Sequence, residues 1–89
     1  MPKPTKSDAV EKEVVRLLAE CREQTGISKN ELSQRTGLSR AAIRLIEEMK
    51  RKPTLYTLLR ISEGLGVELW ELLKEAGAVW TEPKDRRSK

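Results

Sequence analysis

Apolar residues recur at helical spacing along most of the chain, and no stretch alternates between apolar and polar residues as a half-buried strand would. In residues 8–25, Val14, Leu18 and Cys21 fall on one helical face. Two later stretches provide further stripes predicted to be buried, namely Leu55, Leu58, Leu59, Ile61 and Leu65 in residues 54–65, and Leu69, Leu72 and Leu73 in residues 67–75. The pattern predicts an all-α fold.

Capping residues and glycines divide this apolar pattern into five helices. Two pairs of residues have the spacing of a capping box, in which each side chain accepts a hydrogen bond from the backbone of the other residue: Asp8 with Glu11, and Ser28 with Glu31. Thr54, which follows Pro53, is a further predicted cap. The glycines at which helices are predicted to end are Gly26, Gly37, Gly64, Gly66 and Gly77.

Residues 28–47, SKNELSQRTGLSRAAIRLIE, contain two of these helices with a very short turn between them. Gly37 can adopt the left-handed conformation without a steric penalty, and Ser39 can cap the second helix. Because only about three residues separate the helices, they must cross steeply. The shared apolar residues that would fix this angle are Leu32, Leu38, Ile43 and Ile46. This is helix-turn-helix geometry.

From about Val14 to Leu73 the chain resembles the Cro and phage-repressor type (XRE family) of helix-turn-helix regulator. Within the motif, the matching residues are Leu32, Ser33, Gly37, Leu38, Ile43, Ile46 and Glu47. The match continues through residues 50–73, KRKPTLYTLLRISEGLGVELWELL, which resemble the basic loop, proline, fourth helix, glycine turn and fifth helix of that family. The resemblance implies a five-helix, repressor-like DNA-binding domain whose helix-turn-helix is formed by helices 2 and 3.

Four positions depart from the family pattern, at Leu45, Glu48, Met49 and Trp70. The family more often has glycine at position 49, so Met49 implies either local strain or one more turn of helix. Glu48 adds negative charge close to the expected phosphates, and Leu45 stands where some members carry a base-contacting polar residue. We therefore expect an ordinary or weak affinity for DNA.

The length of the chain bounds its organisation. We expect residues 1–7 to form a flexible N-terminal arm, residues 8–77 the helix-turn-helix domain, and residues 78–89 a partly disordered C-terminal tail. A domain of this size is near the lower limit for a stable single core, so a second copy would help to stabilise it. No apolar run is long enough for export or for a membrane span, and we expect a cytoplasmic protein.

Composition argues against an enzyme or a metal protein. The chain has no histidine and one cysteine, so Ser–His and Cys–His nucleophile systems, a thiolate zinc site and an internal disulfide are all unavailable. Cys21 lies on an apolar stripe and is expected to pack in the core. The sequence predicts no enzymatic activity, no cofactor and no metal site.

Positive charge concentrates on the proposed DNA-reading unit. Residues 28–60 carry eight cationic and three acidic side chains, a net charge of +5, whereas residues 8–27 and 61–82 are each net acidic. A basic stripe with acidic flanks suits a polyanion that approaches from one side. A solvated surface is the alternative interpretation.

The second helix of the motif carries the predicted base contacts. An α-helix fits the major groove of B-DNA and reads base edges through its N-terminal residues, which here are Arg40, Ala41 and Arg44. The two arginines are four residues apart, so they project together, and each can form two hydrogen bonds to a guanine. Guanine is therefore predicted in each half-site. Ala42 is interpreted as a helix-forming residue.

Phosphate contacts are predicted at two places beside this helix. The Ser28 hydroxyl, Lys29 and the free N–H groups of the preceding helix can together bind an anion. In the resemblance, the loop that contains Lys50, Arg51 and Lys52 touches the neighbouring phosphates. Taken alone, a run of three cations would be a solvated loop.

Two further sets of residues are assigned structural roles. In the resemblance, Arg22 and Glu47 match an arginine and a glutamate that form a partly buried ion pair. Trp70, Val79 and Trp80 are candidates for a dimer interface, because large aromatic side chains anchor interfaces and are seldom exposed without a reason. The alternative for Trp80 is that it folds back on its own core.

These features predict a sequence-specific DNA-binding transcriptional regulator, a small dimeric repressor or controller that reads a palindromic operator through the major groove. Double-stranded DNA and a second copy of the chain are the expected partners. Two alternatives stay open. One is an antitoxin that represses its own operon and binds a toxin, and the other is a protein-interaction module that has lost DNA binding.

Overall fold

The computed structural model describes residue 3 and residues 5–79, which form five α-helices and no strand. The helices are α1 (Lys6–Gln24), α2 (Lys29–Thr36), α3 (Arg40–Glu47), α4 (Leu55–Leu65) and α5 (Leu69–Val79). The predicted all-α fold with five helices is confirmed. Among the described residues, no helix has the length and apolar character needed to cross a membrane.

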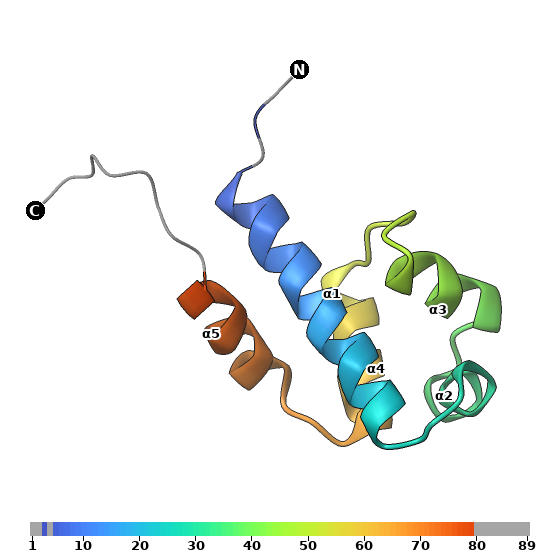
Figure 1. Ribbon diagram of the computed structural model, residues 1–89. Coiled ribbons are helices and arrows are strands. Elements are labelled where there is room, and N and C mark those ends of the chain that lie inside the picture. The colour runs from blue at the N-terminus through green and yellow to red at the C-terminus, as the bar shows by residue number, and fades with distance from the viewer. Residues whose placement is uncertain (1–2, 4, 80–89) are drawn as a thin grey trace, which may run out of the picture.

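The helices pack around α1, which contacts α3, α4 and α5, while α2 contacts α3 and α4. Figure 1 shows α2 and α3 together on one side of the molecule and α5 on the other, alongside α1. The largest fully buried side chains are Leu32, Ile43 and Val14, one each from α2, α3 and α1. The core therefore lies where the helix-turn-helix meets the first helix. Cys21 is half-buried and packs against this core, as predicted.

The predicted start and end of α2 and the predicted start of α3 are correct. The Ser28 hydroxyl accepts a hydrogen bond of 2.9 Å from the Glu31 amide, and the Ser39 hydroxyl accepts one of 3.0 Å from the Ala42 amide. Gly37 has a φ of 79°, the left-handed conformation that glycine favours. The capping box predicted at Ser28 is half formed, because the Glu31 carboxylate pairs with Arg35 at 2.8 Å instead of bonding back to the cap.

The start of α1 differs from the prediction. Thr5 is the cap, and Asp8 is the third helical residue: the Thr5 hydroxyl accepts from the Asp8 amide at 3.1 Å and the Asp8 carboxylate accepts from the Thr5 amide at 3.2 Å. The capping box predicted for Asp8 with Glu11 is therefore wrong. The helix also includes Lys6 and Ser7, which the sequence assigned to the N-terminal arm.

Two glycines do not end helices as predicted. Gly64 lies inside α4, which Gly66 terminates, and Gly77 lies inside α5, which continues to Val79. Without a β-carbon, Gly64 lets α2 approach α4 closely: a β-carbon there would lie 2.7 Å from Thr36 Cγ2 and 2.9 Å from Leu32 Cδ1. Most of the C-terminal tail predicted from the sequence lies outside the described residues.

Three leucines predicted to be buried are exposed, Leu55 by 64%, Leu59 by 44% and Leu73 by 41%. Leu58, Ile61, Leu65 and Leu69 are buried as expected. Helix α4 carries apolar residues on more than one face, and only one face packs on the core. Helix α1 buries more than its main apolar stripe, since Val15 and Leu17 are also buried.

Met49 adopts the strained conformation that was one of its two predicted alternatives. Its φ is 63°, and among the described residues it is the only residue other than glycine with a positive φ. The Met49 amide donates to the Ile46 carbonyl at 3.0 Å, and the Lys50 amide donates to the Leu45 carbonyl at 2.8 Å. This is the Schellman pattern, in which glycine usually occupies the left-handed position.

Candidate nucleic-acid interface

Side chains of α2 fix the turn between α2 and α3. The Ser33 hydroxyl donates to the Leu38 carbonyl at 2.6 Å. The Thr36 hydroxyl donates to the Leu32 carbonyl at 2.8 Å and accepts from the Leu38 amide at 3.1 Å. Because Thr36 is buried, its bond to the Leu32 carbonyl is shielded from water. The turn therefore holds α3 at a defined angle to α2.

Helix α3 has one buried and one exposed face. Ile43 and Ile46 are 0% and 3% exposed, which orients the helix with respect to the core. The predicted base-contacting residues Arg40, Ala41 and Arg44 are all exposed, and Ala42 and Leu45 are half-buried at the edge of this surface. The fold thus brings the three predicted residues together on the solvent side of α3.

The predicted ion pair between Arg22 and Glu47 holds the end of α3 against α1. Arg22 Nε donates to Glu47 Oε2 at 2.7 Å and Arg22 Nη2 donates to Glu47 Oε1 at 3.0 Å, with side chains only 8% and 15% exposed. Hydrogen bonding to Glu47 raises the pKa of Arg22 above its usual value. The remaining Nη1 donates to the Ile27 carbonyl at 2.8 Å, a third partner that the sequence did not reveal.

Two of the cations counted from the sequence have structural partners between α2 and α4. Arg60 donates twice to the Thr36 carbonyl, at 2.9 and 3.2 Å, where α2 ends. Arg35 donates to the Gly64 carbonyl at 2.9 Å and pairs with Glu31. Their guanidinium groups satisfy backbone carbonyls, which the local sequence did not indicate.

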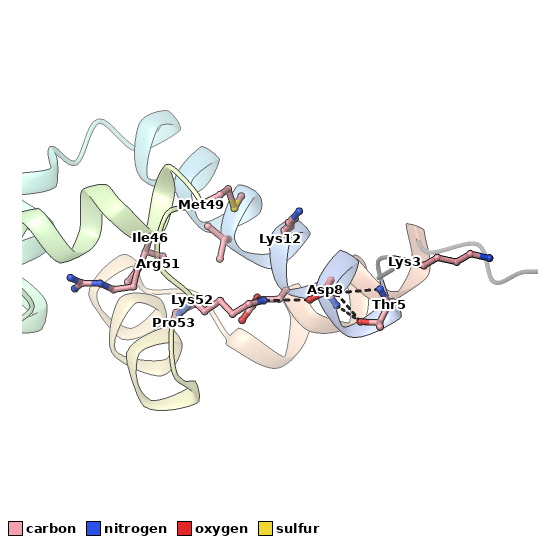
Figure 2. Close-up of a pocket in the computed structure, with 11 residues that line it drawn as sticks. Lys3, Thr5, Asp8, Lys12, Ile46, Met49, Arg51, Lys52 and Pro53 are labelled. Atoms are coloured by element: carbon pink, nitrogen blue, oxygen red, sulfur yellow. Dashed lines mark hydrogen bonds and ion pairs between the residues drawn. The ribbon is translucent and has the colours of Figure 1, made fainter. Parts of the chain in front are cut away.

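Lys52 is directed toward α1. Its Nζ lies 3.3 Å from Asp8 Oδ1 and 3.0 Å from Glu11 Oε1, and these contacts raise the pKa of Lys52. Asp8 has a lowered pKa, chiefly because its carboxylate accepts hydrogen bonds from Thr5. Figure 2 shows Lys52 extending toward Asp8 along a pocket of about 480 Å³, while Arg51 extends the other way. The predicted phosphate contact of Lys52 stays a prediction.

The remaining cations are less engaged. Within the described part of the chain, Lys29, Arg40 and Arg51 make no hydrogen bond or ion pair through their side chains. Arg44 Nη1 and Lys50 Nζ each lie 3.5 Å from Glu48 Oε1, in exposed pairs that water weakens. Ser28 caps α2 and Lys29 is its first residue, and the anion site there stays a prediction.

The candidate dimer residues are only partly within the described region. Trp70 is 59% exposed on α5, Val79 is the last residue of that helix, and Trp80 lies outside the described residues. Four exposed apolar residues that the sequence did not nominate accompany Trp70: Leu55, Tyr56, Leu59 and Leu73. The signal that indicates the first three is the excess of apolar positions on α4 over what one buried face requires.

Comparison with known proteins matches this geometry to a family. The profile of the helix-turn-helix family matches residues 18–72. Among solved structures, the chain is similar to the restriction-modification controller protein C.AhdI from Aeromonas hydrophila, with 28% sequence identity and a TM-score of 0.64. That match covers 71% of this chain and 94% of the controller protein. No match is found among curated proteins.

The family match spans the C-terminal part of α1, the whole of α2, α3 and α4, and the start of α5. It therefore includes the turn at Gly37, the exposed face of α3 and the basic loop that follows. Sequence pattern, fold and family agree. The chain belongs to the helix-turn-helix family of the Cro and phage-repressor type, and it is a DNA-binding transcriptional regulator.

Proposed function

We propose that the protein is a small dimeric repressor or controller that reads a palindromic operator with α3 in the major groove. The observation that carries this proposal is the exposure of Arg40, Ala41 and Arg44 on one face of α3 while Ile43 and Ile46 are buried on the other. A reading helix needs an exposed polar face on a fixed frame. The similarity to a restriction-modification controller protein supports a controller of this kind.

Arg40 is the first base-contacting residue in this proposal. It is the first residue of α3, and its guanidinium has no partner within the described part of the chain. It can therefore donate two hydrogen bonds to the O6 and N7 atoms of a guanine without breaking an internal contact. Arg44 lies one turn further on, and to contact a base it gives up only an exposed ion pair with Glu48. Ala41 lets the helix approach and can contact a thymine methyl.

Phosphate binding is assigned to the start of α2 and to the loop after α3. Lys29 and the N–H groups at the start of α2 attract an anion through charge and through the helix dipole, next to the Ser28 hydroxyl. In the loop, Arg51 is unpaired within the described residues and Lys50 is held only by Glu48. Lys52 stays a predicted phosphate contact, and we propose that it also positions the loop, through its contacts with Asp8 and Glu11 of α1.

The binding test starts from random-sequence DNA selection, followed by fluorescence anisotropy across a range of salt concentrations. Arg40→Ala should relax the preference at one base position and weaken cognate binding by about 1–3 kcal/mol. Lys29→Ala should weaken binding to all duplexes alike and lower the slope of log K against log salt by about one. Arg16→Ala removes an exposed arginine of α1 and is the control, with no expected change in base preference. Wild-type protein that selects no sequence would refute the proposal.

The dimer proposal is supported by the apolar face formed by Leu55, Tyr56, Leu59, Trp70 and Leu73. Leu55 and Leu59 are one turn apart on α4, Trp70 and Leu73 are one turn apart on α5, and Leu55 and Leu73 line the same groove. Large exposed apolar side chains on two adjacent helices favour an interaction site. A second copy is the proposed occupant, because a two-fold dimer presents two reading helices to a palindrome.

Sedimentation equilibrium tests this second part. The wild-type protein should have about twice the chain mass of 10.2 kDa. Leu59→Glu, an exposed substitution in the apolar face, should give the monomer with unchanged far-UV circular dichroism, whereas Gln24→Glu on α1 should stay dimeric. A wild-type monomer would contradict the dimer and favour a different protein partner for this face, as in the antitoxin alternative.

A further inference from the structure

Glu48 carries the negative charge nearest to the proposed base-reading arginine Arg44. One carboxylate oxygen, Oε1, lies 3.5 Å from Arg44 Nη1 and also 3.5 Å from Lys50 Nζ. Arg44 belongs to the proposed base-reading face and Lys50 to the proposed phosphate-binding loop. A single acidic side chain therefore engages two of the cations that DNA would use.

These contacts add little to the stability of the fold. The side chains of Arg44, Glu48 and Lys50 are 49%, 42% and 67% exposed, and exposed ion pairs are weak. Arginine before glutamate is also the less favourable order for a pair four residues apart on a helix. In addition, a carboxylate at the C-terminal end of a helix opposes the helix dipole. Stability therefore does not explain an acid at this position.

We propose that Glu48 is a specificity-determining residue, which acts by weakening the binding of non-cognate DNA more than the binding of the operator. This inference rests on the function proposed above. Non-cognate complexes depend on cations that neutralise phosphates, so a carboxylate that holds Arg44 and Lys50 and repels phosphate acts directly against them. Discrimination then comes from a repulsive element in addition to attractive contacts.

At the operator, the same carboxylate has a smaller effect. Arg44 can leave Glu48 for two hydrogen bonds to a guanine. The internal contact that it gives up is a single exposed pair at 3.5 Å, longer than the 2.7–2.9 Å or so of a strong charge-assisted hydrogen bond. Where no guanine is in reach, Arg44 has only phosphate to exchange for Glu48, and no base contact compensates for the repulsion.

The test compares wild-type protein with Glu48→Gln on two duplexes, the selected operator and a scrambled sequence, across salt concentrations. Glu48→Gln should raise the affinity for the scrambled duplex about tenfold and the affinity for the operator by about threefold or less. The ratio of the two affinities should therefore fall. For the scrambled duplex, the slope of log K against log salt should steepen by about one, because one more cation is free to bind phosphate.

Glu20→Gln is a matched control. Glu20 Oε1 lies 3.7 Å from Arg16 Nη1, with the same four-residue spacing and order, and the side chains are 47% and 54% exposed. Both variants remove one negative charge from an exposed helical pair, but Glu20 is on α1, away from the α3 surface. If Glu20→Gln changes both affinities as Glu48→Gln does, the effect is one of total charge and the inference is wrong.

Other outcomes also decide the matter. If Glu48 instead accepts a hydrogen bond from a cytosine, Glu48→Gln will weaken operator binding, which is the opposite sign. An unchanged affinity ratio and salt slope would overturn the inference while leaving the DNA-binding proposal intact, provided that wild-type protein selects a sequence. If wild-type protein selects none, both fail. The thermal unfolding of Glu48→Gln should match that of wild type, which checks that the fold is retained.

Discussion

At the residue scale, the Arg22 side chain joins three parts of the molecule. It belongs to α1, binds both carboxylate oxygens of Glu47 on α3, and donates to the Ile27 carbonyl between α1 and α2. Removing one member of a buried ion pair leaves an uncompensated charge. Glu47→Ala should therefore lower the free energy of unfolding by about 3 kcal/mol in urea titrations followed by circular dichroism.

Glu23 provides the control for this prediction. Its carboxylate lies 3.8 Å from Arg22 Nη2, but its side chain is 71% exposed, so Glu23→Ala should change stability by no more than about 0.5 kcal/mol. Equal losses in the two variants would contradict the buried-pair interpretation. Apolar replacement of both members of a buried ion pair is often nearly neutral. Here the double replacement also removes the donor to the Ile27 carbonyl. If that carbonyl is cut off from water, its lost hydrogen bond should lower the free energy of unfolding by about 1–3 kcal/mol.

Met49 is expected to lower the stability of the fold, since it occupies a left-handed backbone conformation that is free of strain only for glycine. Met49→Gly should raise the free energy of unfolding by about 0.5–1 kcal/mol, the net of relieved strain and greater freedom in the unfolded chain. The neighbouring Glu48 has a φ of −83°, so Glu48→Gly should destabilise the protein. If Met49→Gly is also destabilising, packing of the methionine side chain outweighs the backbone strain.

At the element scale, Gly64 sets the distance between α2 and α4. An added β-carbon would meet Thr36 Cγ2 and Leu32 Cδ1, and these residues are 4% and 1% exposed, so neither can move aside freely. Gly64→Ala should therefore lower the free energy of unfolding by about 1–3 kcal/mol, although alanine is the better helix former.

Gly77→Ala is the matched substitution for Gly64→Ala. Gly77 is also inside a helix, but among the described residues an added β-carbon would meet no atom within 4 Å beyond its chain neighbours and the backbone of its own helix. This variant should gain about 0.5–1 kcal/mol of stability from helix propensity alone. Urea titration of the two alanine variants separates the two effects. A stabilised Gly64→Ala would show that α2 and α4 can move apart.

The elements also show what the sequence can predict. Caps and turns at Ser28, Gly37, Ser39 and Thr54 were predicted correctly, because each depends on hydrogen bonds within a few residues. Leu55, Leu59 and Leu73 were wrongly predicted to be buried. Helical periodicity identifies apolar faces, but it does not identify which face meets the core. Gly64 was taken for a helix end, since its true role depends on side chains 28 and 32 residues away.

At the scale of the whole molecule, charge is paired over long sequence distances. Lys52 is 44 residues from Asp8, and Arg60 is 24 residues from the Thr36 carbonyl that it binds. The sequence counts eight cations in residues 28–60 toward one basic stripe. Three of the eight are engaged by other helices, and this depends on the tertiary structure.

Acid stability should depend on Asp8. Its pKa is lowered in the folded protein, so its contribution to stability is present above the ordinary value of 3.8 and is lost as the pH falls through the folded-state pKa. Asp8→Asn should therefore be less stable than wild type at neutral pH, and the difference should shrink below pH 3.8. Urea unfolding over this range measures it. A difference that stays constant with pH would mean that ionisation of Asp8 is not involved.

The Gly64 contact has a consequence for how an operator would be matched. Helix α2 is seated on α4 through this contact and through Arg35 and Arg60, while α3 is tied to α1 through Glu47. The reading unit therefore has little freedom to tilt as it enters a groove. If the protein and the operator differ in curvature or groove width, the duplex must therefore deform. Base steps that the protein never touches would then influence affinity through the ease with which they bend.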